Sequence, residues 1–258
     1  MTTRIEIKNF KSIKHIALED CKRINLLIGK PNVGKSNILE ALTSFSLPYA
    51  RYTNNKSIQQ FIRCENESEL FYNGDMSQSI EIRTDSDVFS YKGNQTSIVS
   101  RLNGFINDKS VIELTGLKIK QTGSEMPVKD VRSYVFPTPF QFENTGVKFL
   151  QPTSGSNLSL VLDSLEDVKK DVSDILSLYG LKLSFDKASQ QIKLLKEVSD
   201  GSIYLVPFNS IADTLQRIIF YKAAIASNNN SIITFEEPEA HAYPPYISKI
   251  TTGHYRIT

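Results

Sequence analysis

The stretch that decides the fold reads INLLIGKPNVGKS and spans residues 24–36. Its second part, residues 29–36, fits the pattern GxxxxGK[ST] in full. The two glycines let the backbone curl so that its N–H groups point inward, which is the geometry that holds phosphate groups. The apolar run at residues 24–28 predicts a strand buried in a parallel sheet. The stretch therefore predicts a phosphate-binding loop that directly follows a strand.

The residues after the loop predict a helix at 36–45, because apolar side chains recur there at helical spacing. The N-terminus of this helix adds the positive end of its dipole to the phosphate site. Lys35 is expected to reach the β- and γ-phosphate oxygens, and Ser36 to offer its hydroxyl to Mg²⁺. We therefore expect ATP and Mg²⁺ as ligands. The expected phosphate-loop residues are Gly29, Lys30, Pro31, Asn32, Val33, Gly34, Lys35 and Ser36.

A second motif, SIITFEEPEAH, occupies residues 231–241. Its apolar run at 232–235 predicts a strand that delivers two carboxylates to its C-terminal end. In a magnesium-dependent NTPase one such carboxylate holds the metal and the next polarises the attacking water. We assign Glu236 to the metal, together with Ser36, and Glu237 to the water, so that Glu237 and Lys35 are the expected catalytic residues. Alone, the run would be an ordinary acidic turn; the phosphate loop upstream favours the catalytic interpretation.

A small GTPase is the rival explanation of the loop, because GxPNVGKS also occurs in that class. Those enzymes need a DxxG switch and an NKxD motif that reads guanine. None of the twelve glycines has an aspartate three residues before it. The one Asn-Lys pair, Asn55-Lys56, is followed by Ser57-Ile58, so the carboxylate of NKxD is missing. The sequence therefore excludes a GTPase.

Composition and charge are those of a globular protein with a sizeable core: 40% of the 258 residues are hydrophobic and 22% are charged. The net charge of +2 is too small to indicate a nucleic-acid-binding surface, but it does not exclude DNA as a partner. No apolar run approaches the roughly 20 residues that span a bilayer. The two cysteines and three histidines lack metal-ligand spacing. We expect a cytoplasmic protein without a membrane segment.

The remaining pattern predicts an α/β fold. Residues 47–145 carry short alternating segments that predict a mostly β region, with a short helix near 57–63 and a hairpin turn at 92–94. Residues 158–179 predict one long helix that ends at Gly180. The other expected elements are strands at 4–7, 13–18, 80–84, 88–92, 96–101 and 117–120, a hairpin of strands 192–198 and 203–206 around Asp200-Gly201, and a helix at 211–227.

Three segments resemble the ABC-type ATPase heads of the SMC, RecF and OLD proteins and of bacterial AAA family ATP-binding proteins: residues 9–13, 26–42 and 233–241. The resemblance implies a P-loop NTPase sheet of ABC-ATPase type with a β-rich insertion and a helical arm segment. It divides the chain into residues 1–48, the N-terminal part of the head; 49–145, the insertion; and 146–258, with the arm helix, a signature-like helix and the acidic motif. It also places Asn9, Lys11, Ser12 and Asn37 near the nucleotide.

The resemblance further implies a signature loop that reaches the γ-phosphate of a second subunit. Residues 209–217, NSIADTLQR, match its position, and Ser210 would be the serine that contacts phosphate. Relatives usually have glycine where this chain has Ala212 or Asp213, and Asp213 could instead cap the following helix. A glutamine that senses magnesium is also expected, either Gln141 or Gln151.

The expected activity is ATP hydrolysis by a head that dimerises around ATP, or binds a partner protein, in DNA maintenance or phage defence. The alternative is a nucleotide-gated interaction module with little or no turnover. A nuclease would need a further acidic domain. In the resembled family another strand with a switch histidine follows the acidic motif, and His254 lies too close to Glu237 for that role. We therefore expect a truncated or atypical head with weak turnover and an exposed sheet edge.

Overall fold

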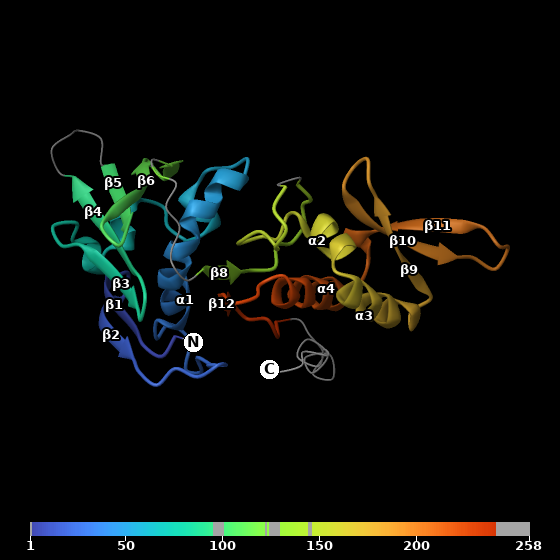
Figure 1. Ribbon diagram of the computed structural model, residues 1–258, viewed down its shortest axis with the longest axis horizontal. Helices are drawn as coiled ribbons and strands as arrows, with labels where there is room; N and C mark the ends of the chain where they lie inside the picture. The colour runs from blue at the N-terminus through green and yellow to red at the C-terminus, as the bar shows by residue number, and fades with distance from the viewer. Residues whose placement is uncertain (1, 95–100, 122, 124–129, 144–145, 241–258) are drawn as a thin grey trace. The chain divides into compact units, whose positions relative to one another are not determined.

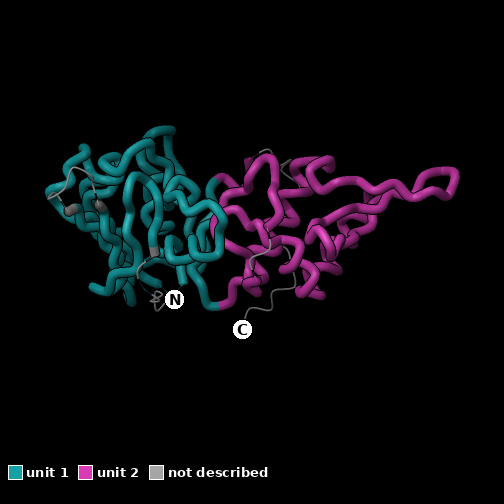
Figure 2. The backbone as a smooth tube through the Cα atoms, turned by 90° about the horizontal axis from the view of Figure 1, so that it is seen from above, with its two compact units in different colours: residues 1–133, 230–236 teal, residues 134–229, 237–258 magenta. Residues whose placement is uncertain are grey.

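The computed structural model describes residues 2–94, 101–121, 123, 130–143 and 146–240. The chain forms two compact units, which Figure 2 distinguishes by colour. Unit 1 contains residues 1–133 and 230–236, and unit 2 contains residues 134–229 and 237–258. His241 at the end of the acidic motif, His254 and most of the strand predicted at 96–101 lie outside the described residues.

Unit 1 is built on a seven-stranded sheet with the order β2-β1-β3-β4-β5-β6-β7, in which all neighbours are antiparallel. This sheet and the helices of the chain confirm the α/β class, whereas parallel pairing, which we expected for the strand before the phosphate loop, is absent from this sheet. The strands predicted at 80–84, 88–92 and 117–120 continue the sheet that the two N-terminal strands begin (Figure 1). The hairpin turn predicted at 92–94 is wrong, because these residues belong to β4 and pair with β5. The strand bounds are β1 Ile5–Phe10, β2 Ile13–Leu18, β3 Ile80–Thr84, β4 Val88–Asn94, β5 Arg101–Ile106, β6 Lys109–Thr115 and β7 Lys118–Gln121.

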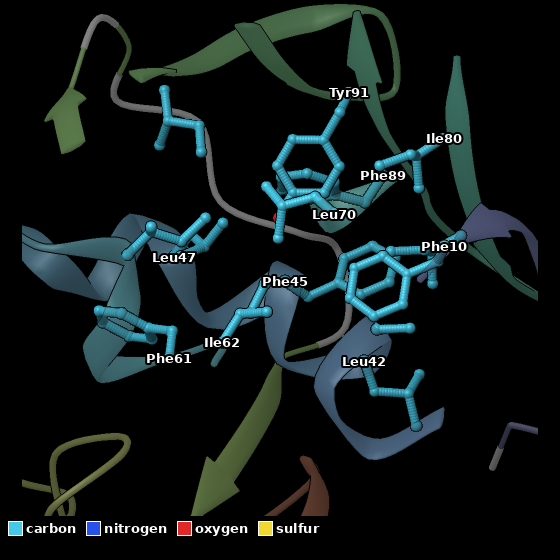
Figure 3. Close-up of a cluster of buried hydrophobic side chains, with 14 of the residues drawn as sticks. Phe10, Leu42, Phe45, Leu47, Phe61, Ile62, Leu70, Ile80, Phe89 and Tyr91 are labelled. Carbon is cyan, nitrogen blue, oxygen red and sulfur yellow. The ribbon is translucent and has the colours of Figure 1, made fainter. Parts of the chain in front are cut away.

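One face of this sheet is apolar and packs against the helix that follows the phosphate loop. Alternate side chains of β1 and β3, such as Ile7 and Ile82, are buried opposite each other in register. Helix α1 (Lys35–Thr43) and the 3-10 helix η1 (Ser44–Tyr52) add buried side chains to the same core. Figure 3 shows Leu42 and Phe45 among the sheet side chains, and the Phe45 ring meets Phe89 edge-on at 5.6 Å. The core thus fixes α1 to the sheet.

A separate two-stranded sheet joins β8 (Val131–Tyr134) to β12 (Ile232–Phe235). The predicted strand at 232–235 is confirmed with the same bounds, and α1 packs against it. Three short 3-10 helices occupy the connection between η1 and β3: η2 Ile58–Gln60, η3 Glu67–Leu70 and η4 Tyr72–Gly74. The helix expected near 57–63 is therefore only a single turn.

The strand predicted at residues 24–28 is wrong for this structure. These residues belong to none of the strands in the described part of the chain. The side chains of Ile24, Leu26 and Ile28 are 76%, 79% and 88% exposed, whereas Leu27 packs partly against the core of unit 1. A strand exists only where a neighbouring strand accepts and donates its backbone hydrogen bonds. The apolar run lacks such a neighbour among the described strands.

Unit 2 combines three α-helices with a three-stranded antiparallel sheet, β11-β10-β9. The hairpin predicted around Asp200-Gly201 is confirmed. The long helix predicted at 158–179 is instead two helices, because Leu165 adopts φ −107° and ψ 84°. Glu166 and Asp167 lie in the first turn of the second helix, where the positive end of the helix dipole stabilises carboxylates. The bounds are α2 Leu158–Ser164, α3 Glu166–Ser177, α4 Asp213–Ala226, η5 Phe208–Ser210, β9 Leu181–Asp186, β10 Gln191–Glu197 and β11 Ile203–Pro207.

Aromatic rings form the core of unit 2 around Phe220 of α4. Its ring meets Phe136 and Tyr134 edge-on at 5.4 and 6.1 Å. Gly155 has φ +66°, and a Cβ atom there would lie 2.5 Å from the Phe220 ring. Only glycine satisfies both conditions, because a side chain would be strained and would collide. In the part of the chain that the structure describes, no helix has the length and apolar character needed to cross a membrane.

Candidate functional site

One of the two glycines of the phosphate loop, Gly34, has a backbone conformation that favours glycine. Gly34 lies at φ 92° and is the residue just before α1, and Asn32 also adopts a left-handed conformation at φ 60°. A Cβ atom on Gly34 would lie 3.3 Å from the Ser12 hydroxyl oxygen. The dihedral angle therefore favours glycine at position 34, and the approach of Ser12 leaves little room for a side chain.

The N-terminus of α1 is open for an anion. Its N-cap residue, Gly34, has no side chain that could accept a hydrogen bond from the first helical N–H groups. The first turn contains no acidic side chain, and residues 28–33 are exposed. Ser36 lies in this first turn and is half-buried. Free N–H groups and the positive end of the dipole together favour a phosphate at this position.

Lys35 folds back over the loop. Its Nζ donates hydrogen bonds to the carbonyl oxygens of Gly29 and Lys30, at 2.8 and 2.7 Å. The ammonium group therefore lies inside the curve of the loop. Phosphate oxygens carry more negative charge than carbonyl oxygens and form stronger bonds with an ammonium group. Lys35 is consequently placed to exchange two loop carbonyls for phosphate oxygens.

The NFKS turn between β1 and β2 lies partly against the phosphate loop. Asn37 Nδ2 donates to the Ser12 hydroxyl at 2.7 Å, so that Ser12 is held beside Gly34. The amide of Asn9 bonds instead to Gln78 Oε1 and the Ser79 carbonyl, at 3.2 and 3.1 Å. Of the two asparagines expected near the nucleotide, Asn37 is thus the one that the structure brings to this part of the site.

A charged network that the sequence analysis missed extends from the NFKS turn to the acidic motif. The carboxylate of Glu40, on α1, binds both the Lys11 ammonium group and Arg63 Nε, the latter at 2.5 Å. A second nitrogen of the same guanidinium binds Glu236 Oε1 at 3.0 Å. The Glu40 carboxylate raises the pKa of Arg63, so this side chain stays charged. Lys11 is therefore occupied by Glu40 in this structure.

Strand β12, which precedes Glu236, is held to α1 by a chain of buried hydroxyl groups. Thr43 on α1 and Thr234 on β12 each contact the Ser133 hydroxyl on β8, with O–O distances of 2.7 and 2.6 Å. The Ile232 N–H also donates to the Asp130 carbonyl at 2.8 Å. Buried hydroxyl groups are costly unless they are paired, so this chain favours one relative position of the three elements. Glu236 follows β12 directly and belongs to unit 1.

Glu237 belongs to unit 2 and has a left-handed backbone conformation. Its φ is 43°, it is exposed, and its carbonyl accepts a hydrogen bond from the Ala240 N–H at 3.0 Å. A non-glycine residue in the left-handed region costs roughly 1–2 kcal/mol. Such strain is typical of functional sites, where the surrounding structure holds a side chain in a specific direction.

The donor atoms of this site fit Mg²⁺ in their chemistry. Ser36 supplies a hydroxyl oxygen and Glu236 a carboxylate oxygen, and Mg²⁺ prefers such hard oxygen ligands. Among the residues that the structure describes, no three His, Cys, Asp or Glu side chains gather closely enough to hold a metal by themselves.

The signature-like loop of unit 2 is tied to the segment that contains Gln141. The Asn209 side chain accepts from the Phe140 N–H at 3.0 Å and donates to the Phe140 carbonyl at 2.9 Å. Ser210 and Gln141, the neighbours of these two residues, are both exposed. Gln151, in contrast, is fully buried, and its side-chain amide has no hydrogen-bond partner within the described part of the chain. Of the two candidate glutamines, Gln141 alone is accessible to a ligand.

Asp213 does not cap helix α4. The N-cap residue is Ala212, and Asp213 is the first helical residue. Its carboxylate instead binds Arg217 Nε one turn further along, at 2.7 Å. The alternative interpretation of Asp213 as a cap is therefore wrong.

Comparisons with known proteins agree with the motifs. A family model described as "AAA ATPase domain" matches residues 1–197. The chain is similar to the DNA replication and repair protein RecF of Caldanaerobacter subterraneus, with 29% identity over 119 residues. It is also similar to an ATP/GTP phosphatase of Helicobacter pylori, with 34% identity over 93 residues, and to an uncharacterised protein of Methanocaldococcus jannaschii, with 49% identity over 45 residues.

These three matches are partial on both sides. They cover 46%, 34% and 17% of this chain, and 28%, 25% and 20% of the RecF, phosphatase and uncharacterised relatives. The chain thus spans about a quarter of the length of each relative. The resemblance to the SMC and RecF group that the motifs indicated is confirmed.

Proposed function

Because the chain belongs to the AAA ATPase domain family, we propose that it binds Mg²⁺-ATP at residues 29–36 and hydrolyses it. The observation that carries this proposal is the open N-terminus of α1 with the Lys35 ammonium group folded into the loop. These two features supply N–H donors, a dipole and a positive charge at one place. A triphosphate satisfies all three.

The proposed chemistry assigns one role to each polar group. Ser36 and Glu236 would hold Mg²⁺, which supplies charge stabilisation for the phosphates when it is bound. Glu237 would accept a proton from the attacking water, and its left-handed backbone supports a fixed direction for this carboxylate. Ser12 and Asn37 would keep the loop in its curled conformation through their hydrogen bond.

The role of the second unit rests on the signature-like loop. We propose that Ser210 and Gln141 face the nucleotide of a second copy, since both are exposed and Asn209 links their segments. The RecF relative is named for DNA replication and repair. DNA is therefore one proposed partner, although a net charge of +2 gives it little support.

A nucleotide-gated interaction module with little turnover is the second candidate. One observation favours it: the expected metal ligand Glu236 already binds the guanidinium of Arg63. A chain in which this pair persists with ATP bound would bind nucleotide but hydrolyse it weakly.

Titration with a fluorescent ATP analogue in Mg²⁺ tests the binding step. Lys35→Ala should weaken binding about 10- to 150-fold, because charge-assisted hydrogen bonds are each worth roughly 1.5–3 kcal/mol. The matched control is Lys14→Ala, which removes an exposed lysine of β2 and should bind like the wild type. Wild-type affinity in Lys35→Ala would contradict the phosphate-loop assignment. Steady-state phosphate release then separates the ATPase from the module without turnover.

A further inference from the structure

We propose that Arg63 is a positioning residue that holds the Glu236 carboxylate before Mg²⁺ arrives and releases it when Mg²⁺ and nucleotide bind. The inference rests on the proposed function, because it concerns the same metal site. It assigns a role to a residue that neither the phosphate loop nor the acidic motif contains.

The guanidinium of Arg63 bridges two carboxylates from different elements. One nitrogen binds Glu40 at 2.5 Å and another binds Glu236 at 3.0 Å. Glu40 lies on α1, which begins at the phosphate loop, and Glu236 follows β12. A planar guanidinium has five N–H donors in a fixed fork, so one arginine can orient both carboxylates at once. The bridge therefore fixes the direction of Glu236 without a metal.

A guanidinium and Mg²⁺ compete for the Glu236 carboxylate. Both are cations that bind a carboxylate through the same oxygen lone pairs, and two cations held so close together repel each other even at a protein surface. Coordination of Mg²⁺ by Glu236, directly or through a water, therefore competes with the Arg63 ion pair and favours movement of the guanidinium away from Glu236. The structure provides a second carboxylate, Glu40, on which the displaced guanidinium remains paired.

The surroundings of Arg63 favour movement of the side chain alone. The side chain is 65% exposed, whereas that of Glu40 is only 7% exposed and is also paired with Lys11. The backbone is held, since the Arg63 carbonyl accepts a hydrogen bond from Lys11 and both neighbouring residues, Ile62 and Cys64, are buried. Glu40 thus acts as a fixed anchor, and rotation of the Arg63 side chain is enough to free Glu236.

The consequence is a competition that metal-binding measurements can detect. In the wild type, part of the free energy of Mg²⁺ binding is used to displace Arg63. Removal of the guanidinium should therefore strengthen metal binding. A gain of this sign does not result from a general loss of structure, which would weaken binding.

Binding of Mn²⁺, followed by its EPR signal in the presence of a non-hydrolysable ATP analogue, measures the competition without turnover. Arg63→Gln should lower the half-saturating Mn²⁺ concentration about two- to fivefold, the range that an exposed ion pair supports. Arg63→Lys, which keeps the charge but cannot form the fork, should fall between Arg63→Gln and the wild type. The matched control is Arg83→Gln, since Arg83 pairs with Glu81 on β3 in the same unit.

A double-substitution cycle tests whether the effect acts through Glu236. In a Glu236→Gln background, the further substitution Arg63→Gln should no longer change Mn²⁺ binding, because the shared carboxylate is gone. An unchanged or higher half-saturating Mn²⁺ concentration in both Arg63→Gln and Arg63→Lys, while the wild type binds metal and analogue, would overturn this inference and leave the proposed function standing. A wild-type chain that binds no analogue with Mn²⁺ would overturn both.

Discussion

Two apolar runs of similar composition lead into the candidate site, and they have opposite fates. Residues 232–235, IITF, form strand β12, which pairs with β8 and packs against α1. Residues 24–28, INLLI, form no strand, and three of their side chains are at least 76% exposed. Both runs favour extended structure by composition. The difference is that β12 has a strand beside it and the other run has none among the described strands.

This difference determines how each part of the candidate site is supported, the acidic motif on one side and the phosphate loop on the other. The hydroxyl chain of Thr43, Ser133 and Thr234 fixes β12, so Glu236 is presented by a supported strand. The phosphate loop depends instead on its own bonds, from Lys35 to two loop carbonyls and between Asn37 and Ser12. A loop can therefore keep a binding conformation although the run before it is exposed.

The largest effect is expected for Glu237, in the acidic motif that begins with strand β12. Glu237→Gln should lower turnover by about 10²- to 10⁴-fold, because glutamine cannot accept the proton of the attacking water. Binding of the fluorescent ATP analogue should be unchanged. Phosphate release and analogue titration measure the two properties separately. Normal turnover in Glu237→Gln together with its loss in Glu236→Gln would mean that the two carboxylates have exchanged roles.

A leucine-to-alanine pair tests the contrast between packed and exposed apolar residues. Leu42 of α1 is 4% exposed and lies in the core of Figure 3. Leu42→Ala should lower the free energy of unfolding of unit 1 by about 2–5 kcal/mol, because it removes buried methyl groups and leaves a cavity. Urea unfolding followed by circular dichroism measures it. A loss below about 1 kcal/mol would contradict the packing of α1 on the sheet.

An intermediate effect is expected from the hydroxyl chain that supports β12. Thr234→Ala removes a buried hydroxyl that contacts Ser133 at 2.6 Å. The free energy of unfolding should fall by about 1 kcal/mol, the usual net contribution of such a hydrogen bond. Ser86→Ala, which removes a hydroxyl that bonds a neighbouring carboxylate in the turn after β3, is a control for loss of a local hydrogen bond. If both substitutions lower the free energy of unfolding equally, the chain of hydroxyl groups does not fix β12.

The smallest effect is expected in the unpaired run. Leu26 is 79% exposed, so Leu26→Ala should change the free energy of unfolding by less than about 0.5 kcal/mol. The same substitution at Leu42 is its matched control, and the same urea titration applies. A loss of about 2 kcal/mol or more from Leu26→Ala, the size typical of a buried leucine, would show that residues 24–28 are packed in solution. The contrast between the two runs would then be wrong.

Several features of the protein follow from its sequence alone. The glycine spacing of residues 29–36 predicted the loop conformation that Gly34 adopts, and the family that the motifs indicated is confirmed. The strands at 13–18, 80–84 and 232–235, and the hairpin around Asp200-Gly201, were also predictable. Each depends on residues close together in the chain, through side-chain alternation or the dihedral angles of a turn.

Other features were decided only by the tertiary structure. A strand at residues 24–28 needs a neighbour that composition cannot supply, and the apolar spacing of residues 158–179 does not reveal the break at Leu165. The bridge of Arg63 to Glu40 and Glu236 joins residues far apart in the sequence, and no spacing rule connects them. The two hydrogen bonds between the Asn209 side chain and the Phe140 backbone likewise join residues far apart in the sequence. Local pattern determines which conformations a segment favours; contacts with distant segments determine which of them it keeps.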